Sequence, residues 1–87
     1  MKELVVFEGK NIRRTWHNNE WYFSVVDVVE ALEVSIQPRK YWSDLKVKLI
    51  EEGFELSDKI GQLKLMSSDG KYYETDCATT KGIFRII

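Results

Sequence analysis

Residues 21–32 read WYFSVVDVVEAL, and the spacing of the apolar side chains changes within this stretch. The aromatic residues 21–23 are typical of a strand. From Val25 onward the apolar residues recur three, four and seven positions apart, which places them on one face of a helix. Ser24, with Asp27 three residues later, has the form of a helix capping box. The stretch therefore predicts a strand that runs directly into a helix.

The chain before this stretch predicts two more strands, at residues 4–7 and 12–16. Turn-forming residues separate these strands at 8–11. Asn18 and Asn19 suit the left-handed backbone that a tight hairpin turn requires. The first 23 residues therefore predict a three-stranded antiparallel meander.

Residues 38–52 predict a second helix, because Pro38 favours a first helical turn and Gly53 favours a helix end. Its apolar side chains are Trp42, Leu45 and Leu49, with Tyr41 alongside. These positions recur at helical spacing, so we expect one side of the helix to be buried.

The last third of the chain predicts a hairpin and then a third helix. Residues 67–70 read SSDG, a strong turn signal between strands at 62–66 and 71–75. Thr79 and Thr80 are candidate caps for the helix that follows. Together the elements predict a small α+β domain, in which an antiparallel meander and a second hairpin pack with two or three helices.

The composition is that of one folded domain. The chain has 87 residues, of which 44% are hydrophobic, and its net charge is −1, which excludes a disordered chain. The predicted third helix reaches Ile87 without a stop signal, so we expect residues 1–87 to be a domain excised from a longer protein. No apolar run approaches the roughly 20 residues of a membrane span. We expect a cytoplasmic protein with no membrane partner.

The reactive residue types argue against an enzyme. The single histidine, His17, lies in a predicted turn, and the single cysteine, Cys77, is typical of a small buried side chain. Two such ligands are too few for a four-ligand zinc site. The five glycines are scattered rather than gathered in a phosphate-binding loop. We expect no catalytic residue, no metal and no cofactor.

The charges are segregated along the chain. Residues 20–36 carry four acids and no Lys or Arg, whereas residues 37–50 carry four bases and one acid. Residues 9–19 carry three bases and no acid. A short apolar helix, a connector and a basic helix follow one another, as in helix-turn-helix proteins. In that motif the first residues of the second helix meet base edges, and Gln and Arg read adenine and guanine.

The eight predicted DNA contacts therefore come from the second helix, from Gln37 directly before it, and from the second strand. The residues expected nearest the bases are Gln37, Arg39, Lys40 and Ser43. The residues expected nearest the phosphates are Arg13, Arg14, Lys46 and Lys48. An ordinary solvated basic face is the competing interpretation of the same helix.

Five motifs resemble one known family. They are FEGKNIR at 7–13, NEWYF at 19–23, DVVEAL at 27–32, RKYWSDLK at 39–46 and TKGIFR at 80–85. Together they resemble the N-terminal domain of the BRO family, which is found in phage and prophage antirepressors and in baculovirus repeated-ORF proteins. The resemblance implies a DNA-binding module of a transcriptional regulator or antirepressor, followed by a separate C-terminal domain. It also favours the basic residues above as DNA contacts, and it implies no catalytic residue. Glu33 departs from the family, in which Gly often follows the first helix.

The expected partner is double-stranded DNA. The alternative is a protein-interaction module that binds a repressor without contacting DNA. Its charged face would comprise Asp27, Glu30 and Glu33, with residues 51–58. A homodimer is a further alternative.

Overall fold

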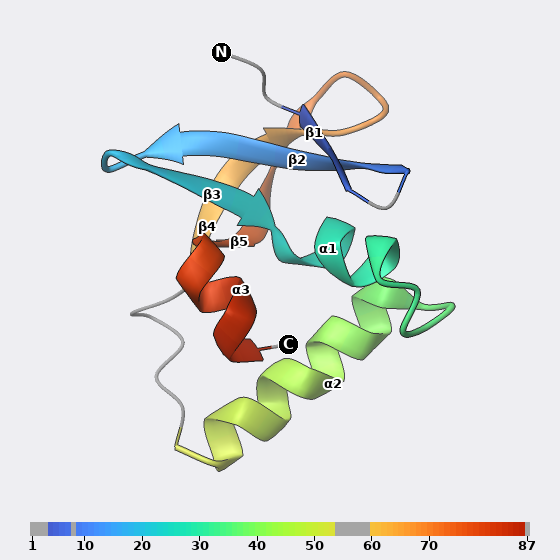
Figure 1. Cartoon of the computed structure of the whole chain (residues 1–87), viewed down its shortest axis with the longest axis vertical. Helices are drawn as coiled ribbons and strands as arrows, with labels where there is room; N and C mark the ends of the chain where they lie inside the picture. Colours follow the sequence, from blue (N-terminus) through green and yellow to red (C-terminus); the bar gives the residue numbers. More distant parts are fainter. Residues whose placement is uncertain (1–3, 8, 54–59, 87) are drawn as a thin grey trace.

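The structure, a computed structural model, describes residues 4–7, 9–53 and 60–86 and has an α+β fold within them (Figure 1). Its elements are β1 (Leu4–Phe7), β2 (Lys10–His17), β3 (Glu20–Ser24), α1 (Val25–Ala31), α2 (Pro38–Glu51), β4 (Ile60–Met66), β5 (Tyr72–Ala78) and α3 (Thr80–Ile86). The strands form one five-stranded antiparallel sheet in the order β1-β2-β3-β5-β4. The helices lie together below the sheet in Figure 1. The predicted fold class is confirmed.

The strands β1, β2 and β3 form the predicted meander. Asn18 and Asn19 make the loop between β2 and β3, and their φ angles of 50° and 63° are both left-handed. Two such residues in succession match the twist of a hairpin. Next to the loop Trp16 pairs with Trp21, and their rings meet edge to face with centroids 5.2 Å apart. This aromatic pair stabilises the register of the hairpin.

The hairpin of β4 and β5 joins the same sheet. Its turn is the predicted one: Gly70 has a φ of 84° and donates its N–H to the Ser67 carbonyl at 2.9 Å. The return strand extends beyond the predicted 71–75, and its last residues, Cys77 and Ala78, pair with the end of β3. The meander and the hairpin, which the sequence predicts as separate units, are therefore parts of one sheet.

The chain changes from strand to helix at Ser24, as predicted. The Ser24 hydroxyl accepts a hydrogen bond from the N–H of Asp27 at 3.3 Å, which caps α1. In a full capping box the Asp27 carboxylate would return to the backbone of Ser24. Here it binds Arg13 of β2, which donates from its backbone N–H at 2.9 Å and from its guanidinium at 2.8 and 3.0 Å. This bidentate ion pair ties the start of α1 to the sheet.

The core lies around α1. Val25 and Val29 pack against Trp42 of α2 and Ala78 of β5, and all four side chains are at most 3% exposed. A second cluster forms where α1 meets Ile12 of β2. The helix α1 is therefore held on one side by the sheet and on the other by α2, despite the weak helix propensity of its valines.

The helix α2 is attached along a narrow stripe of side chains. Trp42 is buried, and Leu45 and Leu49 are partly buried against the same cluster, as predicted. The cap of α3 is also as predicted, because Gly82 donates its N–H to the Thr79 hydroxyl at 3.2 Å. Within the described residues no helix has the length and apolar character needed to cross a membrane.

Candidate nucleic-acid interface

The helices α1 and α2 and their connector stand in the order of a helix-turn-helix pair. Beyond Ala31 the chain passes through Glu33, whose φ of 54° is left-handed. Pro38 lies in the first turn of α2, and the side chain of Gln37, the residue before it, makes no capping hydrogen bond. The first turn also contains no acid. The N-cap side chain therefore accepts no hydrogen bond from the first N–H groups of α2, and no acid in the first turn offsets the partial positive charge at this end of the helix.

The predicted base-reading residues share one exposed surface, which we call the α2 face. It comprises Gln37, Arg39, Lys40 and Ser43, all of which are exposed. Successive helical residues are about 100° apart, so the last three fall within about 100° of one another. Lys40 lies 3.1 Å from Asp44, one turn further on, and both side chains are more than two-thirds exposed. Such a pair is weak in water, so a phosphate can compete for Lys40.

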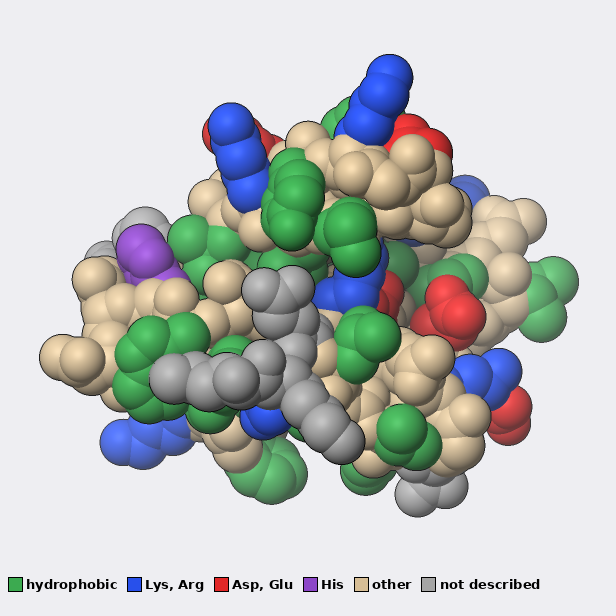
Figure 2. Space-filling view, turned by 90° about the horizontal axis from the view of Figure 1, so that it is seen from above, with side chains coloured by type: hydrophobic (Ala, Val, Ile, Leu, Met, Phe, Trp, Pro, Cys, Tyr) green, Lys and Arg blue, Asp and Glu red, His purple; other side chains and the backbone are tan. Residues whose placement is uncertain are grey.

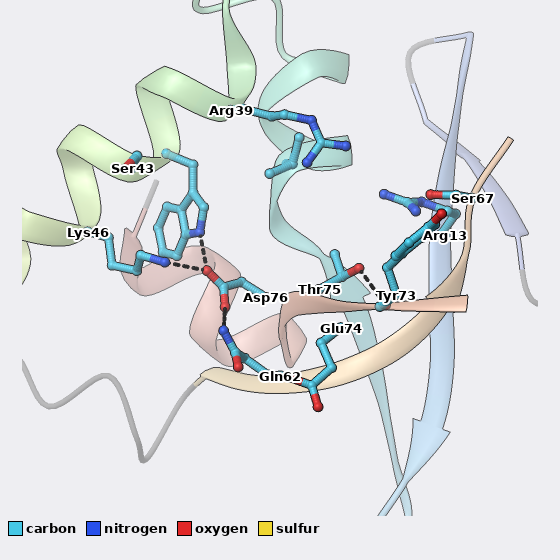
Figure 3. Close-up of a pocket in the computed structure, with 12 residues that line it drawn as sticks. Arg13, Arg39, Ser43, Lys46, Gln62, Ser67, Tyr73, Glu74, Thr75 and Asp76 are labelled. Atoms are coloured by element: carbon cyan, nitrogen blue, oxygen red, sulfur yellow. Dashed lines mark hydrogen bonds and ion pairs between the residues drawn. The ribbon is translucent and has the colours of Figure 1, made fainter. Parts of the chain in front are cut away.

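Lys46, predicted as a phosphate contact, is held in an ion pair, and its side chain is 34% exposed. Its Nζ lies 2.7 Å from Asp76 of β5, which also accepts hydrogen bonds from Trp42 Nε1 at 2.8 Å and Gln62 Nε2 at 3.3 Å (Figure 3). Partial burial alone would raise the pKa of Asp76. The hydrogen bonds from Lys46, Trp42 and Gln62 outweigh it and hold the pKa below its ordinary value. This network fixes α2 against β4 and β5.

The two predicted strand contacts face in different directions, because neighbouring residues of a strand point to opposite faces. Arg13 is paired with Asp27, and these side chains are 22% and 14% exposed. Arg14 lies over the ring of Trp21, with its guanidinium carbon 3.8 Å from the ring centroid. Lys48 follows Arg39 by nine residues, which places it about 180° away around α2.

Figure 2 views the molecule from above, with the sheet toward the viewer. The Lys and Arg side chains visible there are scattered among hydrophobic and acidic ones. A mixed surface of this kind provides no strong local field for an anion. The face in this view therefore presents no broad basic surface, and the case for DNA contact depends on the α2 face.

Two adjoining hollows flank Arg39. The first has a volume of about 490 Å³ and lies between α2 and β5. The second, of about 400 Å³, lies between α1 and the start of α2. The predicted site residues that line one or both of them are Arg13, Gln37, Arg39, Lys40, Ser43 and Lys46. The structure thus brings six of the eight predicted residues together and leaves Arg14 and Lys48 outside.

The residues of β5 that line the first hollow were not predicted from the sequence. They are Tyr73, Glu74, Thr75 and Asp76. A strand pattern shows which residues share a face but not which helix lies beside the strand. The proximity of β5 to α2 depends on the pairing of Cys77 and Ala78 with β3, and no local signal predicts that pairing.

The charges around these hollows are mostly compensated. Arg13 is neutralised by Asp27, and Lys46 by Asp76. In the part of the chain that the structure describes, the guanidinium of Arg39 has no ion-pair or hydrogen-bond partner. Arg39 is therefore the cation that remains available to an anionic ligand.

The acidic face of the alternative interpretation is only partly exposed. Asp27 is held by Arg13, and Glu33 lies 3.8 Å from Lys10. Glu30 is exposed, and residues 54–58 of the second acidic segment lie outside the described residues. Binding of a repressor through this face stays a prediction.

The residues with reactive side chains are dispersed. Cys77 is fully buried, and burial raises the pKa of its thiol to about 11. His17 is exposed at the end of β2, where its ring meets Tyr22. Across residues 4–7, 9–53 and 60–86, no three His, Cys, Asp or Glu side chains are grouped to hold a metal ion.

No family model, curated protein or solved structure matches this chain. The resemblance to the BRO family therefore depends on the sequence motifs alone and stays a prediction.

Proposed function

We propose that this chain is a double-stranded DNA-binding module that places the start of α2 in the major groove. The observation that carries the proposal is the α2 face. Gln37, Arg39, Lys40 and Ser43 are exposed together at the start of a helix that follows α1 through a short connector. This is the part of a recognition helix that meets base edges.

The chemistry of the α2 face suits nucleic acid. Arg39 has an uncompensated guanidinium among the described residues, and such a group reads guanine bidentately in the major groove. Gln37 has the side-chain amide that reads adenine. The uncapped first turn of α2 favours a phosphate at the helix N-terminus, and Lys40 lies in the same turn.

The other predicted residues take different places in this proposal. Arg13 and Lys46 position α1 and α2 through Asp27 and Asp76, and we assign them no direct contact with DNA. Arg14 and Lys48 lie outside the α2 face and stay predictions as phosphate contacts. The resemblance to the BRO family supports the same function and extends the proposal to a phage- or prophage-derived regulator or antirepressor.

The test compares two double substitutions that remove the same charge from different places. Arg39→Ala with Lys40→Ala removes both cations of the α2 face. Lys64→Ala with Lys71→Ala removes two exposed cations of the β4–β5 hairpin. Each chain is titrated into a labelled random-sequence duplex, and fluorescence anisotropy is measured at fixed salt.

We expect the α2 variant to lose about tenfold or more in affinity, which corresponds to about 1.4 kcal/mol. We also expect the slope of log affinity against log salt to become shallower by about 1.8. On a random-sequence duplex neither cation has a specific base to read, so each neutralises a phosphate instead. The hairpin variant should stay within about threefold of the parent, since only long-range attraction changes. Equal losses in the two variants would show that total charge matters and that α2 does not dock.

A further inference from the structure

The strand β5 has one edge that is largely unpaired. It pairs with β4 along its whole length but with β3 only through Cys77 and Ala78. The reason is that β3 ends at Ser24, where the chain turns into α1. Val25 would otherwise continue β3 opposite Asp76. Among the described residues, 72–76 therefore have no strand neighbour on this side.

The backbone groups on this edge can be assigned from the hairpin turn. Ser67 donates its N–H to the Lys71 carbonyl at 2.8 Å, so these two residues form a hydrogen-bonded pair. In an antiparallel ladder such pairs alternate with pairs whose N–H and C=O groups point away from the partner strand. The register continues from this pair along the ladder. Tyr72, Glu74 and Asp76 point their N–H and C=O groups away from β4, toward the unpaired edge of β5, which we call the free edge. The same alternation directs Ala78 toward β3, with which it pairs.

The free edge borders the first hollow. Figure 3 shows β4 on one side of β5, and Arg39 of α2 and Arg13 of β2 on the other side, around the hollow. The hollow has a volume of about 490 Å³, within the range of pockets that hold a ligand. Its lining includes the edge residues Glu74 and Asp76. A chain lying along β5 would therefore also contact α2.

The charge of the hollow indicates what kind of chain fits. Asp76 is neutralised by Lys46, and Glu74 lies opposite Lys64 in the ladder. Of the cations that line the hollow, Arg39 is the one without an ion pair among the described residues. A carboxylate beneath Arg39 would form the charge-assisted bidentate pair that guanidinium groups favour.

We propose that the free edge of β5 and Arg39 bind an extended acidic peptide segment of another protein. The segment adds a strand antiparallel to β5, in the place that β3 leaves when the chain turns into α1. A peptide fits better than nucleic acid, because donors and acceptors alternate along the edge at the spacing of a second strand. This inference goes beyond DNA binding and does not depend on it. Both ligands use Arg39, so the peptide and DNA exclude each other.

The first experiment identifies the peptide and its position. A displayed library of random eight-residue peptides is selected on the 87-residue chain. The most enriched peptide is then titrated into the isotope-labelled chain, and amide hydrogen exchange is followed by NMR. We expect enriched peptides to share an Asp or Glu at one register. We also expect the amide protons of Tyr72, Glu74 and Asp76 to exchange at least about tenfold more slowly in the complex.

The second experiment separates the backbone edge from its side chains. Glu74→Pro removes an N–H that points away from β4, a position where an edge strand tolerates proline. Glu74→Ala removes the same side chain and keeps the N–H. We expect the proline variant to lose about tenfold or more in peptide affinity and the alanine variant to stay within about threefold. Arg39→Gln should weaken binding about tenfold and abolish the preference for an acidic peptide.

Three results would overturn the proposal. One is a selection that enriches no peptide on the folded chain. Another is equal peptide affinity of the Glu74→Pro and Glu74→Ala variants. If the proline variant does not fold, the amide hydrogen exchange of the first experiment decides instead. The last is slower exchange of the Tyr72, Glu74 and Asp76 amide protons with a single-stranded oligonucleotide but not with the enriched peptide. That result would assign the free edge to nucleic acid.

Discussion

At the scale of single residues, two carboxylates decide which cations near α2 are free to meet a ligand. Asp27 holds Arg13, which lies 14 residues away, and Asp76 holds Lys46, which lies 30 residues away. A sequence shows the charge of a basic residue but not its partner in the fold. Arg13 and Lys46 were therefore predicted as phosphate contacts, whereas the structure places them in ion pairs that fix α1 and α2. Arg39 is exposed at the start of α2, and its contact with DNA stays a prediction.

The network around Asp76 leads to a prediction about stability. Asp76→Asn removes the charge that Lys46 faces in a partly buried site, and losing such a charged hydrogen bond costs about 1–3 kcal/mol. We expect the free energy of unfolding in urea to fall by that amount near neutral pH. Glu20→Gln, at an exposed acid of β3, is the control. It should change the free energy of unfolding by less than about 0.5 kcal/mol. Equal values for the two variants would show that the network does not stabilise α2.

The pH dependence of the same variant follows from the lowered pKa of Asp76. A carboxyl with a lower pKa in the folded than in the unfolded chain contributes its full stabilisation above its unfolded pKa of about 3.9. That contribution is lost as the pH falls through the folded value. We therefore expect the stability difference between the parent and Asp76→Asn to be constant near neutral pH and to shrink below about pH 4. A difference that grows on acidification would contradict this assignment.

At the scale of elements, the switch from β3 to α1 organises the molecule. Ser24 ends a strand and caps a helix. This change leaves residues 72–76 of β5 without a strand partner on the β3 side, within the described residues. The sequence pattern predicts the switch because the hydrophobic period and the capping residue agree at Ser24. It does not predict that β5 pairs with β3, since strand periodicity specifies faces and not neighbours. The elements were therefore predictable, while the joined sheet and the hollow beside it were not.

Just beyond the end of α1 lies a residue whose backbone conformation costs energy. Glu33 has a φ of 54°, a left-handed conformation that costs a residue with a Cβ atom about 1–2 kcal/mol. We expect Glu33→Gly to raise the free energy of unfolding by about 1 kcal/mol, because glycine adopts this conformation without the clash. Thermal or urea unfolding measures the change.

Glu33→Ala is the matched control for this substitution. It removes the same side chain, including its 3.8 Å approach to Lys10, and keeps the Cβ atom. The Lys10 pair is exposed and worth little, so alanine should not stabilise the chain. Stabilisation by alanine equal to that by glycine would show that the side chain, and not the backbone, is unfavourable here.

At the scale of the whole molecule, a net charge of −1 coexists with the exposed cations of the α2 face. The acids of α1 and the bases of α2 are segregated along the chain, and the fold then pairs Arg13 and Lys46 with carboxylates. At the start of α2 this leaves Arg39 and Lys40 as the exposed cations of the α2 face. This small surface predicts DNA binding through few phosphate contacts, with moderate dependence on salt.

The most direct test of DNA binding is the affinity of the unaltered chain for a random-sequence duplex as salt is raised. Each neutralised phosphate contributes a slope of about −0.9 to the logarithm of the binding constant against the logarithm of the salt concentration. The α2 face predicts two or three such contacts, and hence a slope of about −2 to −3. A folded chain that does not bind at low salt, or whose affinity does not change with salt, would contradict the proposal that α2 docks on DNA.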